Sequence, residues 1–324
     1  MDAPAGPANK MTVRRFFFVC AVSASLVAGA FILLAALLPS DATKHILELR
    51  GRFGGADVLA NRSDARSSIR SIGLRNDHGE VLTTVWIRRP LALARDYRIV
   101  MTYAGADTGD AILRLIPPQD DLVVVAVQYP WRPPHSVAGR LRGIYDIRQA
   151  AYRTVAGGIL TIDELANVER LDTRRIILIG ASLGSVFATI HGAIDPRVQQ
   201  VVLIHGGADL QDTLEASARR VPRWIRSPLA RIARIPIDTF DPAHYVARIA
   251  PRNLLMIAAR DDWRFPPHAV IAFFSRAGQP KELRWTNTAH VGARSPRVVE
   301  TVIAEMNAYL REHRRPIAQN CCER

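Results

Sequence analysis

The amino-acid sequence predicts an α/β protein with a mostly parallel β-sheet covered by helices on both faces, preceded by one N-terminal transmembrane helix. Three observations lead to this prediction. Continuous apolar, β-branched runs of strand length alternate with helix-compatible segments along most of the chain, as is typical of sheets buried on both faces. One such run stops at a Gly-x-Ser-x-Gly pentad and passes directly into a helical segment. A long uncharged stretch lies near the N-terminus.

The uncharged stretch is residues 16–38, in which Phe, Val, Leu, Ile and Ala dominate. As a helix it would be about 35 Å long, against a hydrocarbon core of about 30 Å. Lys10, Arg14 and Arg15 precede it, so residues 1–15 should stay cytoplasmic and the rest of the chain should be extracytoplasmic, which means periplasmic in a bacterium. The alternative is a cleaved signal peptide and a secreted protein. The apolar core exceeds the roughly 7–15 residues usual for a signal, which favours an uncleaved, single-pass membrane anchor.

The segment after the predicted anchor, residues 39–66, has a mixed composition, and we expect it to be a tether. The globular domain should cover residues 67–315, with a tail at 316–324. Two early strands, 68–74 and 80–88, are expected to form a hairpin across residues 76–79 and to add an antiparallel edge to the sheet.

The remaining elements follow in alternation. Buried strands are expected at 97–103, 122–128, 174–179, 200–204, 254–258 and 282–285. Helices are expected at 137–169 (broken at Gly157 and Gly158), 186–193, 267–276 and 296–314. Residues 205–250 form an Arg-rich insert or lid between two of these strands.

The pentad Gly180-Ala181-Ser182-Leu183-Gly184 makes Ser182 the leading candidate for a nucleophile. A sharp strand-to-helix turn strains its middle residue and exposes that residue's side chain. Glycine is expected at the two flanking positions because a Cβ there would collide with the opposite arm of the turn. The Leu183 N–H and the positive end of the helix dipole would then face an oxyanion forming beside the Ser182 hydroxyl. An ordinary glycine-rich turn is the alternative.

The order of elements and the pentad resemble the α/β-hydrolase fold over roughly residues 67–315, and the run 171–176 is similar to the dienelactone-hydrolase and prolyl-oligopeptidase branch. This resemblance implies a triad in the chain order Ser, acid, His. It implies Asp262 as the acid, in a turn after the penultimate strand, with Asp209 as the alternative. It also implies His290, in the loop after the last strand, as the base, and the Ala106 N–H as a second oxyanion donor.

A serine hydroxyl becomes a good nucleophile when a neutral imidazole accepts its proton, and the acid holds that imidazole in the required tautomer. We therefore expect a membrane-anchored serine hydrolase that cleaves an ester or thioester through an acyl-enzyme. The alternatives are an acyltransferase with the same triad and a non-catalytic, membrane-anchored binding protein. We expect no cofactor and no metal, and Cys20, Cys321 and Cys322 all lie outside the predicted domain.

The net charge of +13 comes mainly from arginine and is concentrated in one segment. No acidic residue lies between Glu215 and Asp238, whereas six arginines occur there, interleaved with Trp224 and aliphatic residues. The segment is either a solvated surface or a cationic face that contacts anionic lipid, in which case the contacting residues would be Arg219, Arg220, Arg223 and Arg226. No nucleic-acid-binding motif accompanies the charge, so nucleic acid is not expected as a partner.

Overall fold

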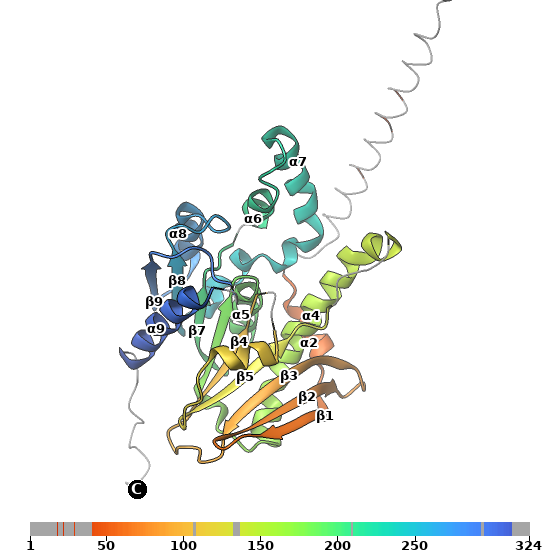
Figure 1. Ribbon diagram of the computed structural model, residues 1–324. Coiled ribbons are helices and arrows are strands. Elements are labelled where there is room, and N and C mark those ends of the chain that lie inside the picture. The colour runs from red at the N-terminus through yellow and green to blue at the C-terminus, as the bar shows by residue number, and fades with distance from the viewer. Residues whose placement is uncertain are drawn as a thin grey trace, which may run out of the picture.

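A computed structural model describes residues 18, 22, 29, 41–105, 108–131, 137–208, 210–292 and 295–312. Within them one nine-stranded sheet runs in the order β1-β2-β3-β5-β4-β6-β7-β8-β9 (Figure 1). The strands β1 to β3 are antiparallel to their neighbours, and the others are parallel. Their bounds are β1 Phe53–Ser63, β2 Ser67–Asn76, β3 Val81–Pro90, β4 Arg98–Tyr103, β5 Leu122–Gln128, β6 Ile176–Ala181, β7 Val198–Ile204, β8 Asn253–Ala259 and β9 Lys281–Thr286.

Helices cover both faces of the sheet, as predicted. One face packs against α2, α4, α5 and α8, and the other packs against α3 and α9. The α-helices are α2 Thr43–Arg50, α3 Asp110–Leu115, α4 Val137–Asn167, α5 Gly184–Ile194, α6 Leu210–Ser217, α7 Arg223–Arg234, α8 Pro267–Arg276 and α9 Pro296–Glu312. Short 3-10 helices are η1 Thr173–Arg175, η2 Ile235–Phe240, η3 Pro242–His244 and η4 Val246–Ile249. The sequence did not predict α2, α3, α6 or α7 as helices.

The central strands are apolar on both sides because each side has its own layer of helices. In β4, Ile99 and Met101 enter the cluster that contains α4 and α5, while Val100 enters the cluster that contains α9. This alternation repeats in β6 to β8, and it accounts for the uninterrupted apolar runs in the sequence. The predicted parallel sheet is confirmed, and strand ends differ from the expected ones by a few residues.

The prediction of a tether over residues 39–66 was wrong. Helix α2 buries Ile46 completely against the core, and β1 pairs along most of its length with β2. Strand β1 was missed because its side chains are mostly exposed and carry no apolar alternation. At Gly54 a Cβ would lie 2.1 Å from the Asn76 carbonyl oxygen, so this glycine allows close pairing of the two chains.

The expected break in the long helix at Gly157 and Gly158 was also wrong, because α4 runs unbroken through both residues. A Cβ at Gly157 would lie 2.3 Å from the Thr83 side chain, and one at Gly158 would lie 1.8 Å from the Tyr103 hydroxyl. These glycines let the helix lie close to β3 and β4. They are packing residues, and the lower helix propensity of glycine is offset by tertiary contact.

The predicted anchor, residues 16–38, lies outside the described residues except for Phe18, Val22 and Gly29. Across the part of the chain that the structure describes, every helix is too short or too polar to cross a bilayer. The predicted tail, residues 316–324, likewise lies outside the described residues.

Glu164 of α4 is a buried carboxyl group that should affect how the stability of the fold depends on pH. The residue is fully buried, and neither carboxylate oxygen has a hydrogen-bond partner among the described residues. Burial, reinforced by the nearby Glu169, raises the pKa of Glu164. The folded state therefore binds this proton more tightly than the unfolded state, and stability from this group is lost as pH rises above the unfolded pKa.

We predict that Glu164→Gln, which cannot ionise, gains stability relative to the wild type as pH rises above the unfolded pKa of 4.5. Urea denaturation at several pH values measures the difference. A constant difference between the two proteins across those pH values would contradict the prediction.

Candidate active site

Ser182 occupies the tight turn between β6 and α5, and its backbone has φ +53°. Few residues other than glycine adopt this left-handed conformation, and it persists only where the surroundings enforce it. The Ser182 N–H donates to the Ile204 carbonyl of β7 at 2.9 Å. The Ser182 carbonyl accepts from the Ser185 N–H at 3.0 Å and from the Ser185 hydroxyl at 2.6 Å. The turn therefore has the strain expected from its sequence.

The two flanking glycines are required for different reasons. A Cβ at Gly180 would lie 2.6 Å from the Gly184 carbonyl oxygen, on the opposite arm of the turn, as predicted. A Cβ at Gly184 would instead lie 2.0 Å from the Tyr103 carbonyl oxygen of β4. The expectation was therefore wrong for Gly184, because this glycine allows α5 to approach the neighbouring strand.

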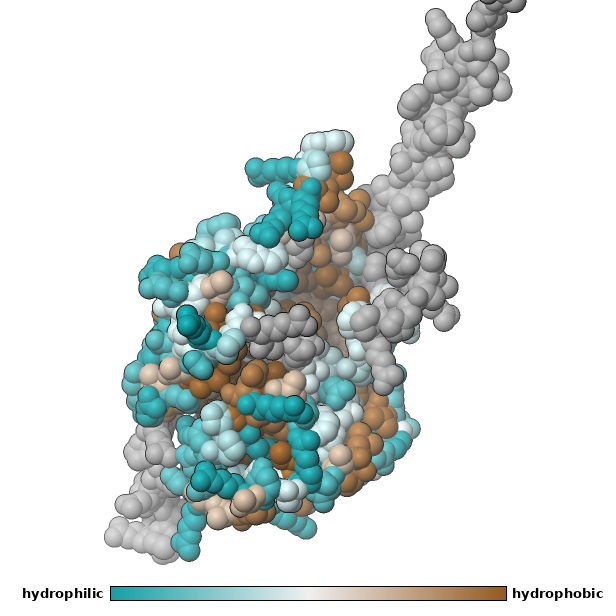
Figure 2. Space-filling view, in the orientation of Figure 1, coloured by the Kyte–Doolittle hydropathy of each residue, from teal (hydrophilic) through white to brown (hydrophobic). Residues whose placement is uncertain are grey.

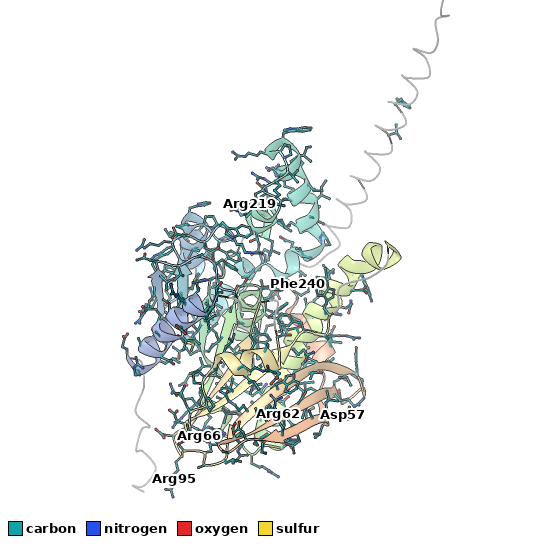
Figure 3. The ribbon with its side chains drawn as sticks, in the orientation of Figure 1. Asp57, Arg62, Arg66, Arg95, Arg219 and Phe240 are labelled. Carbon is teal, nitrogen blue, oxygen red and sulfur yellow. The ribbon has the colours of Figure 1, made fainter. Side chains whose placement is uncertain are left out.

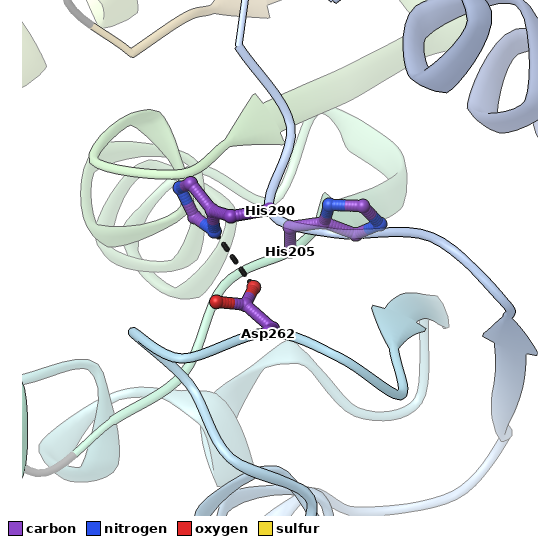
Figure 4. Close-up of side chains that lie close together, drawn as sticks. All are labelled: His205, Asp262 and His290. Atoms are coloured by element: carbon purple, nitrogen blue, oxygen red, sulfur yellow. Dashed lines mark hydrogen bonds and ion pairs between the residues drawn. The ribbon is translucent and has the colours of Figure 1, made fainter.

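The structure brings the three predicted residues Ser182, His290 and Asp262 together. The Ser182 Oγ lies 2.8 Å from His290 Nε2. The other ring nitrogen, Nδ1, lies 2.7 Å from Asp262 Oδ2 (Figure 4). This chain of hydrogen bonds assigns the proton of a neutral His290 to Nδ1, which leaves the Nε2 lone pair for the serine hydroxyl.

Asp262 is held rigidly by the loop that follows β8. Its side chain is buried, and Oδ1 accepts hydrogen bonds from the backbone N–H groups of Arg264 at 2.8 Å and Phe265 at 3.2 Å. One carboxylate oxygen therefore fixes the loop while the other faces His290. The Phe265 ring also lies beside the imidazole, with 5.9 Å between ring centroids.

The structure describes one of the two predicted oxyanion donors, Leu183. The Leu183 N–H lies at the N-terminus of α5, directly after Ser182. Ala106 lies outside the described residues, as does Asp209, the alternative acid. The described residue before Ala106 is Gly105, at which a Cβ would lie 3.6 Å from the Ser182 Cβ. The chain after β4 therefore passes close to the serine.

His205 is a residue of the site that sequence reasoning missed. It follows β7, is almost fully buried and has φ +45°. Its Nδ1 accepts a hydrogen bond of 2.8 Å from the N–H of Val291, the residue after His290. Its backbone N–H donates to the Ile257 carbonyl at 2.8 Å. His205 therefore connects the end of β7 to the loop that carries His290.

His205 precedes Asp262 in the chain, whereas the resemblance implies a base that follows the acid, so the sequence did not indicate His205. Its sequence signal was its position at the carboxyl end of a predicted parallel strand, where site residues gather. Two other histidines follow Asp262 in the chain: His268 is exposed on α8, and His313 lies outside the described residues.

His205, Asp262 and His290 could also be considered as metal ligands, because one ligand atom from each lies within 4.8 Å of the others. In this arrangement, however, His205 Nδ1 accepts from Val291 and His290 Nδ1 donates to Asp262. A cation bound by the two Nδ1 atoms would have to replace both hydrogen bonds. The donor set is therefore used internally and fits a proton-transfer network better than a metal site.

With this geometry the chain has the α/β-hydrolase fold, and solved structures of that fold are similar to it. An acetyl xylan esterase from Paenibacillus sp. R4 matches with a TM-score of 0.61 and 17% identity, over 83% of this chain and 92% of that one. Acetyl xylan esterase 1 from Thermoanaerobacterium sp. matches with a TM-score of 0.58 and 14% identity, over 84% and 94%. The α/β hydrolase GrgF from Penicillium sp. matches with a TM-score of 0.51 and 15% identity, over 76% and 98%.

Sequence comparison adds one short match. The hydrolase LUC6 of Fusarium sp. is 43% identical over 63 residues, which are 19% of this chain and 14% of that protein. The matched stretch is thus only a small part of the length of the Fusarium protein. No protein-family model matches the chain.

His205 should affect the pH dependence of stability. Burial lowers its pKa from 6.5 to about 4; the charge of Asp262 opposes this shift, and His290 adds to it. Between these pH values the unfolded chain binds a proton that the folded His205 does not. The free energy of unfolding should therefore fall as pH decreases from about 6.5 to about 4.

We predict that His205→Gln removes up to about 3 kcal/mol of this pH-dependent loss. Glutamine retains an acceptor for the Val291 N–H, so the variant should fold. Chemical denaturation at several pH values measures the difference. His191, which is also buried with a lowered pKa, is present in both proteins, so its contribution cancels. Parallel pH profiles in the two proteins would contradict the assignment.

Proposed function

We propose that this protein is a membrane-anchored serine hydrolase that cleaves an ester or thioester through an acyl-enzyme. The observation that carries the proposal is the continuous chain of hydrogen bonds from Ser182 Oγ through His290 to Asp262. Neighbours with the same fold are named esterases and hydrolases, and this supports an enzyme that acts on ester bonds.

In the proposed reaction, the Ser182 oxygen attacks the substrate carbonyl as His290 Nε2 accepts the hydroxyl proton. The imidazolium that forms is stabilised by the carboxylate of Asp262, 2.7 Å from Nδ1. Negative charge develops on the former carbonyl oxygen. The Leu183 N–H at the start of α5, with the helix dipole behind it, would stabilise that charge. The second donor would be the Ala106 N–H.

Collapse of the tetrahedral intermediate breaks the bond to the leaving group, which takes the proton from His290 Nε2. Ser182 is then esterified by the acyl group. A water molecule attacks this ester while His290 accepts one of its protons, and the carboxylic acid departs as the serine regains its hydrogen. The same two-step cycle would serve a thioester.

The membrane location rests on the sequence alone. The uncharged segment 16–38 is long enough to span a bilayer, and Lys10, Arg14 and Arg15 precede it. With this orientation the hydrolase domain would be extracytoplasmic.

We predict that Ser182 forms a covalent adduct with a fluorophosphonate. Intact-mass measurement should detect one adduct on the wild type and none on Ser182→Ala. Ser275→Ala, which changes an exposed serine of α8, is the matched control and should be labelled fully. An adduct that persists in Ser182→Ala would refute the assignment of the nucleophile.

For the acid, we predict that Asp262→Asn lowers kcat for a chromogenic ester by about 10³–10⁴-fold, because an amide cannot stabilise the imidazolium. Asp261→Asn, one residue away and exposed, should leave kcat nearly unchanged, and so should Asp209→Asn. If activity depended on Asp209 instead, the choice of acid would be reversed. A panel of acyl chain lengths with the same assay would define the acyl preference.

The proposed topology predicts that a reporter fused after Arg324 is active only on the extracytoplasmic side of the membrane. Replacing Lys10, Arg14 and Arg15 with Glu should reduce this activity, because the charge bias that retains the N-terminus is reversed. Reporter activity in the cytoplasm of the unmodified fusion would refute the orientation.

A further inference from the structure

Helix α7 presents its apolar side to the outside of the molecule. Ile225, Leu229 and Ile232 recur at the spacing of one helix face, and all three are exposed, Leu229 by 53%. Trp224 beside them is 78% exposed. The one buried residue of the helix is Ala230, which belongs to the other side. Amphipathic helices in globular proteins normally have the reverse arrangement.

The polar side of α7 makes the contacts that hold the helix on the protein. The Ser227 hydroxyl donates to Glu215 of α6 at 2.9 Å. Arg234 forms an ion pair of 2.9 Å with Asp238 of η2. Figure 2 shows the result at the projection formed by α6 and α7: hydrophilic residues gather on one side and hydrophobic residues on the other. The helix is therefore attached by polar contacts with its apolar face left uncovered in the described structure.

Arginines lie before α7 and on the side of the helix away from Ile225, Leu229 and Ile232. Arg219, Arg220, Arg223 and Arg231 are exposed, and the segment between Glu215 and Asp238 contains no acid. Exposed Trp and aliphatic residues bordered by cations are typical of a helix that lies in the interface of an anionic bilayer. Each arginine near such a surface contributes about 1 kcal/mol at moderate salt.

The continuous described segment that starts at Asp41 begins beside the residues that follow α7. Asp41 pairs with Arg248 of η4 at 2.7 Å. The Ala42 N–H donates to the Tyr245 hydroxyl at 2.7 Å, and that hydroxyl donates to the Thr239 carbonyl of η2 at 2.7 Å. Helix η2 directly follows α7. In the sequence, the predicted membrane span ends at residue 38, three residues before Asp41, which is fixed beside the segment that follows α7.

From these observations we infer that the face formed by Trp224, Ile225, Leu229 and Ile232 inserts into the interfacial layer of the same anionic phospholipid bilayer that residues 16–38 span. The inference rests on the proposed membrane anchor. The anchor keeps the domain close to the bilayer, and α7 then fixes which side of the domain faces it. Insertion removes the apolar face from water, while the arginines interact with lipid phosphates.

This orientation would bring the candidate active site close to the membrane. The Arg219 guanidinium lies 4.5 Å from the centroid of the Trp263 ring, and Trp263 directly follows Asp262. The segment that leads into α7 is therefore in contact with the loop that carries Asp262. An ester in the outer leaflet would then be close to Ser182. Strand β1, at the opposite end of the domain, would be farther from the membrane.

The inference is tested on the full chain reconstituted in vesicles of phosphatidylcholine and phosphatidylglycerol. Cys20, Cys321 and Cys322 are first replaced by serine. A nitrobenzoxadiazole label is then attached at Leu229→Cys on α7 or, as the control, at Leu59→Cys on β1, which is similarly exposed at 60%. Figure 3 shows Arg219 and Asp57, which mark these two regions, at opposite ends of the domain. The rate of reduction by external dithionite reports access from water.

We expect the label at position 229 to be reduced several-fold more slowly than the label at 59. The protection should weaken when Arg220, Arg223 and Arg231 are replaced by Gln or when phosphatidylglycerol is omitted, with hydrolysis of a small soluble ester unchanged. Equal rates at 229 and 59 in protein that floats with the vesicles would overturn the inference while leaving the anchor intact. Protection that disappears as the protein is diluted with lipid would indicate a second copy on this face and would also overturn it.

Two further readouts separate this inference from the proposed function. Protein that fails to float with vesicles would overturn the anchor together with the inferred contact. Fluorophosphonate labelling of Ser182 in the same vesicles reports the proposed chemistry independently of where α7 lies.

Discussion

The strained turn at Ser182 is the constraint on which the rest of the structure depends. A residue other than glycine in the left-handed region costs about 1–3 kcal/mol, so neighbouring elements must enforce it. The Ile204 carbonyl of β7 holds the Ser182 N–H on one side. On the other side, Gly184 lies against the Tyr103 carbonyl of β4. Because β6 lies between β4 and β7 in the sheet, both constraints require the central strands to be in register.

A buried polar network supports this turn from behind. The Tyr103 hydroxyl lies 2.7 Å from His191 Nδ1, and His191 lies beside Asp195 at the end of α5. Burial opposes the charge on Asp195, but the nearby His191 and the hydrogen bonds from Arg197 outweigh it and hold the pKa of Asp195 below its usual value. Arg197 also pairs with Asp163 of α4, which in turn pairs with Arg50 of α2. The network thus connects α2 to α5, the helix that follows Ser182.

The candidate site lies at the carboxyl edge of the parallel sheet. Ser182 follows β6, His205 follows β7, Asp262 follows β8 and His290 follows β9. Parallel strands direct their carboxyl ends to the same edge, so four distant segments meet there. Hydrogen bonds between the loops then fix the distances, most directly the bond from the Val291 N–H to His205. The segment with α6 and α7 follows β7 at this same edge. Arg219, between these two helices, lies over Trp263 in the loop that carries Asp262.

The sequence by itself determined the class of fold and the three residues of the hydrogen-bonded chain. Apolar periodicity is local, so the central strands and the helices α4, α5, α8 and α9 were predictable from it. The order of Ser182, Asp262 and His290 followed from the resemblance to a known fold. Their approach to within hydrogen-bond distance could not be derived from the sequence, because it depends on the register of separate strands.

Only the tertiary structure decided the remaining features. Strand β1 is stabilised by backbone pairing with β2 and carries almost no side-chain pattern. Gly157 and Gly158 are typical helix breakers that are used instead for close packing against β3 and β4. The amphipathic pattern of α7 was visible in the sequence, but which face would be buried was not. That choice depends on contacts with Glu215 and Asp238, and a periodic pattern alone carries no information about the partner a face will meet.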